Sequence, residues 1–508
     1  MSVSNLDACL MHVVSCLKRG RSRQALVSRL GVFSLALSLL SCGGGAGVSL
    51  SLNAPGGVGS GGSGLIEGLI AGFGSVIVDG VEVDDSSAIS QTDDETGQFT
   101  LTQTQLGQRV KITQSQAGVA SIITIVPLLR GPVTASVQSN YFQVLGQWVQ
   151  VLPQNTATGN ATVLSGLTNL NVLQNNVAVQ VYGVWVFDST KNAHVLQASR
   201  IELLSAAPAY NLVSGIVMGR NNNDLLINQS GAATAVHALN ALPTSISNGS
   251  LIRAWVQASQ VSSGNVFAAQ RVLDATSTPS NGQTLLISVP TSAGNVQNGQ
   301  LQTQGLNLQI PPNLVSQMPS SSALVQLNVL NTNGVLTVTQ VNTSSNNTAL
   351  QAQVAGQVEL KGAIPWVANP VSINLRGSLV VGTNVPGVIN KSCPAQNVPN
   401  PIQVDIIAKM GPPGMPLVAQ SINCTLTPPN QSVIQQSGYL LSYAANLSTL
   451  TFSIAGNPVT MSLIPGTVLP PPPNDLPNLV KSKTPLTIEY QVINSVNQIR
   501  DFQPATPN

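Results

Sequence analysis

Short aliphatic runs, broken by turn residues every eight to twelve positions, constrain the fold of this chain more than any other sequence feature. The runs are rich in Val, Ile, Leu and Thr, and they are either alternately or continuously apolar. Clear examples are residues 75–78, 109–112, 179–182 and 324–327. A period of two with Gly, Asn and Asp at the breaks predicts strands and hairpins, and no long stretch has the helical period. We therefore expect an all-β protein.

The strand pattern itself repeats along the chain, which indicates tandem modules. A unit opens with Gly among aliphatic residues and closes on a strand with an Ala-x-Arg motif, ending at Arg200 in one unit and at Arg271 in the next. A chain of 508 residues is also too long for one core. The predicted modules 1 to 6 cover residues 65–128, 129–206, 207–274, 275–345, 350–425 and 426–508. Modules 4 and 6 are assigned by spacing rather than by motif.

Three segments carry a resemblance to a known family. They are Gly-Phe-Gly-Ser-Val-Ile-Val-Asp-Gly-Val (72–81), Arg-Gly-Pro-Val (130–133) followed by Val-Leu-Gly-Gln-Trp-Val (144–149), and Ala-x-Arg-Ile-Glu (198–202). The chain thereby resembles domain-of-unknown-function family 5666, found in tandem in Gram-negative lipoproteins, most clearly over residues 65–275. The resemblance implies small OB-like β-barrels and transfers no catalytic residue. A closed barrel also removes the exposed strand edges that template aggregation.

The first 41 residues have the features of a signal peptide. A basic stretch from Lys18 to Arg29 precedes an apolar run, residues 30–40, that is too short to span a bilayer. The run ends in Leu39, Leu40, Ser41 and Cys42. This ending resembles the lipobox of bacterial lipoproteins, in which an aliphatic and a small residue precede a cysteine. The alternative is a plain secretory signal with an incidental cysteine, and the true start is either Met1 or Met11.

The lipobox resemblance implies that Cys42 becomes the first residue of the mature chain. Its thiol would carry diacylglycerol and its amine an N-acyl chain, and several acyl chains anchor a protein stably. Residues 42–64 would then be the lipidated cysteine and a Gly/Ser-rich flexible tether. Because Gly43 is not the Asp that retains many lipoproteins at the inner membrane, we expect the outer membrane of a Gram-negative cell, facing the periplasm or the cell surface.

Two cysteines remain in the mature chain besides the lipid site. They are Cys393 and Cys424, an even pair in an oxidising compartment, and we predict a disulfide between them. Two buried thiols are the alternative. No Cys or His spacing indicates zinc.

Acidic residues crowd together near the start of module 1. The candidates for calcium ligands are Asp84, Asp85, Asp93, Asp94 and Glu95. The spacing is not that of an EF-hand, and the alternative is a solvated loop of mutually repelling charges, so no metal site is assigned.

Tryptophans occur about once per module, at Trp148, Trp185, Trp255 and Trp366. Core packing is favoured over a stacking platform for sugars or single-stranded nucleic acid. We also expect the two motif arginines, Arg200 and Arg271, to pair or snorkel at the seams between modules.

The function predicted from these features is that of a lipid-anchored envelope protein with a structural or interaction role. No P-loop, nucleophile elbow or signalled carboxylate pair occurs, so we name no catalytic residue. The expected partners are the membrane, through the lipid, and envelope proteins or glycans. Nucleic acid is excluded because the basic excess lies in the leader. A carbohydrate- or small-ligand-binding lipoprotein is the alternative, and an envelope hydrolase is the third hypothesis.

Overall fold

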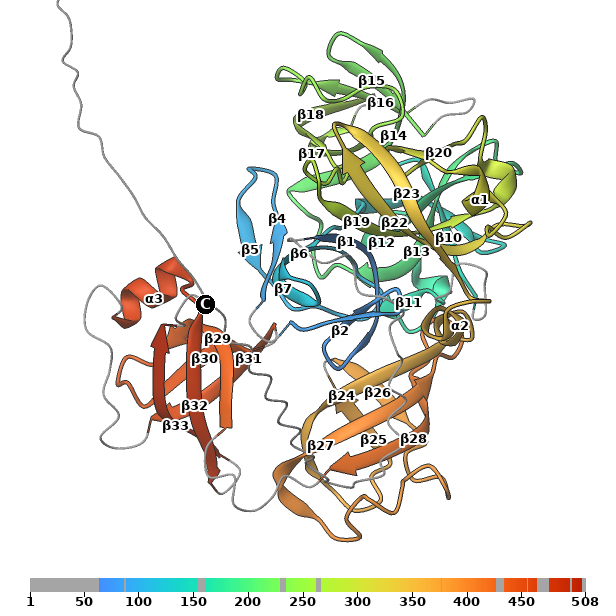
Figure 1. Ribbon diagram of the computed structural model, residues 1–508. Coiled ribbons are helices and arrows are strands. Elements are labelled where there is room, and N and C mark those ends of the chain that lie inside the picture. Colours follow the sequence, from blue (N-terminus) through green and yellow to red (C-terminus); the bar gives the residue numbers. More distant parts are fainter. Residues whose placement is uncertain are drawn as a thin grey trace, which may run out of the picture. The chain divides into compact units, whose positions relative to one another are not determined.

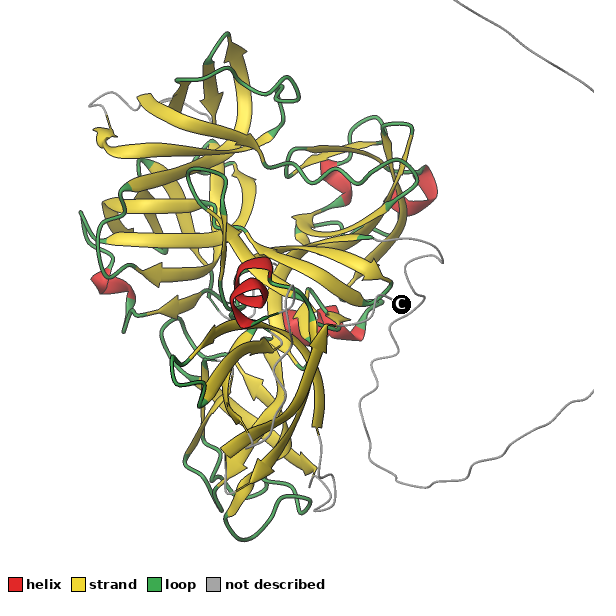
Figure 2. Cartoon of the chain, turned by 90° about the vertical axis from the view of Figure 1, so that its left-hand side faces the viewer, coloured by secondary structure: helices red, strands yellow, loops and turns green. Residues whose placement is uncertain are grey.

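A computed structural model describes most of the chain after the tether. The described residues are 64–85, 88–153, 161–228, 234–261, 266–375, 377–425, 434–454, 456–463, 475–493 and 496–504. Strands dominate these residues, and the helices among them are short (Figure 2). The all-β prediction is confirmed.

Module 1 closes into a barrel of OB type. Its described strands are β1 (Leu65–Phe73), β2 (Val76–Val78), β3 (Val81–Val83), β4 (Ile89–Asp93), β5 (Phe99–Leu101), β6 (Arg109–Gln116) and β7 (Val119–Ile125). β1, β2 and β3 form an antiparallel meander, and β6 pairs with both β1 and β7. β4 continues the third strand of the barrel and pairs in parallel with β7. The resulting order, first-second-third-fifth-fourth-first, is a five-stranded Greek-key barrel.

Modules 2 and 3 repeat this order. Module 2 contains β8 (Leu129–Gln138), β9 (Tyr141–Val144), β10 (Gln147–Val151), β11 (Val163–Ser165), the 3-10 helix η1 (Leu170–Val172), β12 (Ala178–Asp188) and β13 (Ala193–Leu203). Module 3 contains β14 (Tyr210–Asn221), β15 (Asp224–Ile227), β16 (Thr234–Ala238), β17 (Leu251–Val261) and β18 (Val266–Asp274). The third strand pairs in parallel with the fifth, as β10 with β13 and β16 with β18. The first pairs with the fourth, as β8 with β12 and β14 with β17.

Modules 4 and 5 follow the same scheme in the pairing of their third, fourth and fifth strands. Module 4 contains β19 (Thr284–Thr291), η2 (Ala293–Asn295), β20 (Gln300–Thr303), β21 (Leu306–Gln309), α1 (Pro312–Val315), β22 (Ala323–Thr332) and β23 (Val335–Thr343). Helix α2 (Thr348–Val354) follows it. Module 5 contains β24 (Gln357–Trp366), β25 (Ser372–Leu375), β26 (Ser378–Val381), β27 (Val398–Lys409) and β28 (Leu417–Thr425). The third and fifth strands are again parallel, as β21 with β23 and β26 with β28.

Module 6 is a closed barrel of its own. It contains β29 (Ile434–Tyr443), β30 (Thr449–Ile454), β31 (Asn457–Leu463), α3 (Leu476–Ser482), β32 (Leu486–Ile493) and β33 (Val496–Pro504), all visible in Figure 1. α3 lies between the third and the fourth strand, and Leu476 and Leu479 bury its inner face in the barrel's core. The six predicted ranges thus each hold one set of strands with related pairing, while their boundaries stay a prediction.

Strand β1 also joins module 1 to two other modules. Its residues Leu65 to Glu67 pair in parallel with β19 of module 4. Its last residue, Phe73, pairs with Leu360 of β24 in module 5. β19 and β24 are the first strands of their modules, so β1 satisfies backbone groups on edges that would otherwise be exposed.

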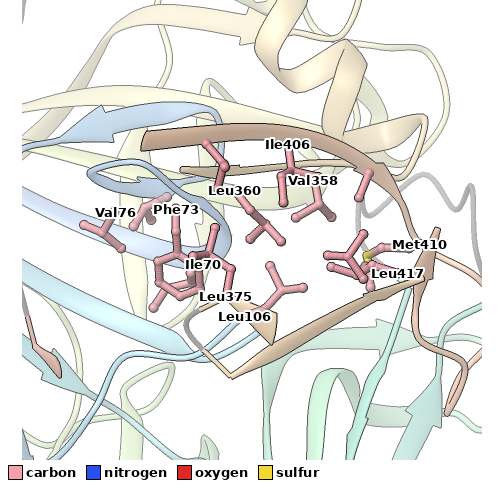
Figure 3. Close-up of a cluster of buried hydrophobic side chains, with 14 of the residues drawn as sticks. Ile70, Phe73, Val76, Leu106, Val358, Leu360, Leu375, Ile406, Met410 and Leu417 are labelled. Atoms are coloured by element: carbon pink, nitrogen blue, oxygen red, sulfur yellow. The ribbon is translucent and has the colours of Figure 1, made fainter. Parts of the chain in front are cut away.

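Hydrophobic clusters cross the module ranges in the same way. One cluster combines modules 1 and 5, and Figure 3 shows Ile70 and Phe73 of β1 in it together with Leu360 of β24 and Leu375 of β25. A second cluster spans modules 2 and 3. Modules 4 and 6 have clusters of their own. Burial is therefore shared by modules that are far apart in sequence.

Candidate functional site

The predicted lipid site lies outside the described residues. This holds for the whole leader, including Leu39, Leu40, Ser41 and Cys42, and for the tether up to residue 63. Among the described residues, no helix is long and apolar enough to cross a membrane. The lipid anchor therefore stays a prediction from the sequence.

Cys393 and Cys424 form a disulfide in the structure, which is the pairing that the sequence favours. The Cα atoms are 4.7 Å apart, and the bridge spans a sequence separation of 31 residues. Cys424 lies in β28 and is buried in the cluster shared by modules 1 and 5. The bridge fastens the long connection between β26 and β27 to the fifth strand of module 5, which is a structural role.

The acidic residues Asp93 and Asp94 of module 1 interact with other residues of this chain. Asp93 accepts from Arg253 Nη1 at 2.7 Å and from Arg271 Nη1 at 3.3 Å, so it is the counter-ion of two module 3 arginines. Asp94 accepts from the backbone N–H groups of Thr96 and Gln98 and orders a turn.

The remaining three predicted calcium ligands do not complete a site. The backbone of Asp84 bridges to β7, Asp85 is buried, and Glu95 is half-buried in the turn after β4. No three His, Cys, Asp or Glu side chains gather as a metal site in the described part of the chain. The geometry around Asp93 and Asp94 is that of an ion pair and a turn.

Arginines hold the seams between modules, as expected for the Ala-x-Arg motif. Arg271 also donates to the carbonyl of Asp94 at 2.7 Å, and Arg253 Nε donates to the carbonyl of Pro127 at 3.0 Å. Both guanidinium groups lie over the indole of Trp255, with the carbons of Arg271 and Arg253 4.4 and 4.7 Å from a ring centroid. Ion pairing and cation–π contact therefore stabilise the buried charge of Arg253 and the partly exposed charge of Arg271.

Arg200 has the equivalent place in module 2. Its Nη1 donates to the carbonyl of Leu106 at 3.0 Å, its Nη2 bonds the side chain of Gln105, and its Nε donates to Glu202 Oε1 at 2.5 Å. Beside it is a cavity of about 360 Å³ that is also lined by Met410 and Leu417 of module 5. Because three acceptors already engage the guanidinium, Arg200 stabilises the contact between modules rather than binding a ligand.

A buried carboxyl, Asp79, joins module 1 to module 4 and to α2. Its Oδ2 accepts from the Leu69 N–H at 3.0 Å and its Oδ1 from Gln353 Nε2 at 2.9 Å. The Asp79 carbonyl accepts from Gln326 Nε2 of β22 at 3.0 Å. Burial raises the pKa of Asp79 to about 6, although its hydrogen bonds with Gln353 and Leu69 act in the opposite direction.

Carboxylates on β24 and β27 bear on the hydrolase hypothesis. Lys361 Nζ is 2.6 Å from Glu359 Oε1, and Lys361 lies opposite Asp405 in the register. Burial and the nearby Glu359 raise the pKa of Asp405. A glycosidase needs two carboxylates facing a cleft, and the cavity beside Arg200 is lined by neither of these two.

The four tryptophans divide into two groups. Trp185, Trp255 and Trp366 are buried, as favoured from the sequence. Trp148 is only half-buried. It is therefore the tryptophan with a ring surface available to a partner.

An aromatic pair lies on the outer face of module 2. Tyr141 begins β9 and Trp148 lies in β10, with ring centroids 6.5 Å apart and an interplanar angle of 87°. Their neighbours Phe142 and Val149 belong to the core. Alternation along a strand therefore places both half-buried aromatic side chains on the outside.

Lys191, in the loop between β12 and β13, covers this pair. Its Nζ is 4.4 Å from the Trp148 ring centroid and 4.6 Å from that of Tyr141. The Tyr141 hydroxyl donates to Asp188 Oδ2 at 2.8 Å and accepts from Gln150 Nε2 at 2.9 Å. We call Tyr141, Trp148, Gln150, Asp188 and Lys191 the aromatic face.

Protonation on the aromatic face follows from these contacts. Burial, with the hydrogen bond to Asp188, raises the pKa of Tyr141 to about 12. Burial alone would raise the pKa of Asp188, but hydrogen bonds from Thr190 and Tyr141 hold it below its usual value. The face therefore presents a neutral phenol beside a carboxylate at neutral pH.

Sequence reasoning singled out Trp148 but missed its partners on the aromatic face. The available signal was the alternation in two short neighbouring strands, because Tyr141, Trp148 and Gln150 all fall on outward positions. Lys191 and Asp188 are brought to the face by the hairpin of β12 and β13, which the pattern of one strand does not reveal.

Comparisons with known proteins add little to this geometry. No family model matches the chain, so the resemblance to family 5666 stays a prediction, and no curated protein matches. Among solved structures, the chain is similar to drosophila Unr CSD456 at 12% identity, over 38% of this chain and 80% of that chain. The TM-score is 0.14, and at that value the likeness carries no argument.

Proposed function

We propose that this chain is a lipid-anchored protein of the Gram-negative outer membrane with a structural or interaction role and no catalysis. The leader and lipobox up to Cys42 support the anchor. Only 7% of the residues are charged, and the observation that carries the structural role is how these few charges are used. Asp93, Arg200 and Arg253 bond across module seams.

This use of charge favours a structural body over a catalyst. A catalytic cleft needs titratable groups that face substrate, whereas these side chains are buried and already paired within the protein. Neutral Asn, Gln, Ser and Thr side chains hydrate much of the outside instead, as on β20 and β21. These paired charged side chains therefore hold modules together.

The anchor is tested by mass spectrometry of the membrane fraction from cells producing the chain. We expect wild type to give an N-terminal peptide that starts at acylated Cys42, and Cys42→Ala to lose both the acylated peptide and membrane retention. Cys16→Ala is the matched control, because it removes another leader cysteine and should keep the anchor. A soluble, unacylated wild-type chain that starts elsewhere would overturn the proposal.

A carbohydrate-binding lipoprotein is the second candidate function. The aromatic face favours it, since hydrogen bonds with Asp188 and Gln150 hold Tyr141 on the outside and Trp148 packs edge-on against that ring. In five-stranded barrels of this topology, the face of the second and third strands and the loop between the fourth and fifth bind oligosaccharides and oligonucleotides. β9, β10 and the Lys191 loop are those elements in module 2.

A further inference from the structure

We propose that the aromatic face of module 2 is a subsite for one neutral pyranose ring of a glycan, with Lys191 as the side chain that moves aside to admit it. The inference deepens the second candidate function and rests on it. It does not depend on the lipid anchor, because the face lies wholly within module 2.

Module 2 differs from modules 3, 4 and 6 at this place. In modules 4 and 6 the outward positions of the second and third strands carry Gln, Asn and Thr. These residues are Gln300, Gln302, Asn307 and Gln309 in module 4, and Thr449, Thr451 and Thr460 in module 6. In module 3 the cross-strand pair at the same place is Asp224 with His237. An outward aromatic pair is therefore no requirement of the barrel itself.

The aromatic face is preorganised by hydrogen bonds. Gln197 Nε2 donates to Gln150 Oε1 at 3.1 Å, and Gln150 in turn donates to the Tyr141 hydroxyl. The register places Gln197, Gln150 and Tyr141 side by side across β13, β10 and β9. Asp188 accepts hydrogen bonds from the Tyr141 hydroxyl and from the backbone N–H of Thr190. Because the Tyr141 side chain is already fixed by these hydrogen bonds, it loses little rotamer freedom when a ligand binds.

The two rings of the aromatic face attract groups that carry positive charge on their surface. The face of an aromatic ring is electron-rich, and in the free protein the Lys191 ammonium occupies it. The C–H face of a pyranose is weakly positive and flat, so it can replace the ammonium on Trp148. Hydroxyl groups at the ring edge then meet the Asp188 carboxylate and the Gln150 amide, which supply an acceptor and a donor.

Charge selects a neutral sugar over other ligands. Asp188 is ionised at neutral pH, as the direction of its pKa shift shows, and it repels phosphate and uronate groups. Only Lys191 on this face opposes that repulsion, whereas single-stranded nucleic acid binds in grooves that track its backbone with many cations. The aromatic face therefore fits a neutral glycan.

The test follows the four tryptophans of the full chain by fluorine NMR after 5-fluorotryptophan labelling. Cellotetraose is the neutral probe, with tetragalacturonate and an oligothymidylate as charged probes. We expect cellotetraose to shift the Trp148 signal and to leave the three buried tryptophans unchanged. A Trp148 signal that does not respond to cellotetraose would overturn the proposal, as would tighter binding of either charged probe.

Variants separate the subsite from general glycan binding. Trp148→Ala should weaken cellotetraose at least tenfold, measured by calorimetric titration, while Lys191→Ala should tighten it severalfold because the ring no longer has to be uncovered. Gln302→Ala, on the equivalent face of module 4, is the matched control and should change nothing. Cellotetraose binding that survives Trp148→Ala would keep the second candidate function and overturn this site. Lys191→Ala changes only a loop side chain, so a weaker affinity in that variant contradicts the gating role.

Discussion

Asp79 shows how a single buried carboxyl makes the stability of the protein depend on pH. Its pKa of about 6 in the folded state lies above the ordinary value of 3.8, so the folded protein holds the proton more tightly than the unfolded chain. The contribution is therefore fully present below about pH 4 and is lost as pH rises through 6. Its size is on the order of 3 kcal/mol.

The prediction is tested with Asp79→Asn, which cannot titrate. Urea unfolding of wild type and variant between pH 4 and 7.5 should give a difference in the free energy of unfolding that shrinks with rising pH. The substitution removes an acceptor for Leu69 or Gln353, so the variant should be less stable at low pH. Parallel pH profiles for the two proteins would contradict this role of Asp79.

At the residue scale, the sequence predicts chemistry best where a motif repeats. The recurrence of Ala-x-Arg was enough to place Arg200 and Arg271 at seams, and both are found there. Asp93 could not be assigned in the same way, because its partner Arg253 is 160 residues distant in the sequence. An acidic cluster looks alike in sequence whether its counter-ion is calcium or a distant arginine.

Among the elements, the turn before β6 brings the backbone of module 1 close to that of module 2. Gly107 has a φ of +81°, and a Cβ there would lie 2.7 Å from the carbonyl oxygen of Ser199. The Ser199 hydroxyl donates to the Gly107 carbonyl at 2.6 Å. Both the backbone conformation and the contact therefore require glycine.

Gly107→Ala and Gly118→Ala form a matched pair for this contact. Gly118 has a φ of +78°, and a Cβ there would meet nothing within 4 Å, so alanine costs only the left-handed conformation, about 1 kcal/mol. Gly107→Ala should cost about 1–3 kcal/mol more, because a side chain must displace β13. Urea unfolding of both variants measures the difference, and equal costs would show that the seam tolerates a methyl group.

Strands were more predictable than the joins between them. The aliphatic pattern of residues 109–112 and 179–182 predicts strands where β6 and β12 are found, because strand preference is read from neighbouring residues. The pairing of β1 with β19 and β24 is not local, since it joins segments more than 200 residues apart. The short helices α1 and α3 were also missed, because four or seven residues are too few to show a helical period.

At the scale of the whole molecule, modules 1 to 5 are joined by strands, cores and charges, whereas module 6 closes on itself. β1 contributes to pairings in three modules, and two hydrophobic clusters each extend over several module ranges. Module 6 has its own barrel and its own core of described residues. We therefore expect residues 65–425 to behave as one cooperative unit and residues 434–504 as another.

We infer that the few charged side chains hold the modules together. Hydrogen exchange in urea, measured on wild type and on Asp93→Asn, tests this most directly. Asp93→Asn removes the counter-ion that Arg253 and Arg271 share. Removing one partner of a buried ion pair costs about 3–5 kcal/mol of stability. We predict that amides across modules 1 to 5 lose protection together and that module 6 is unchanged. Asp224→Asn, in an exposed pair, should change less than about 1 kcal/mol. Loss of protection confined to module 3, or none at all, would contradict the account.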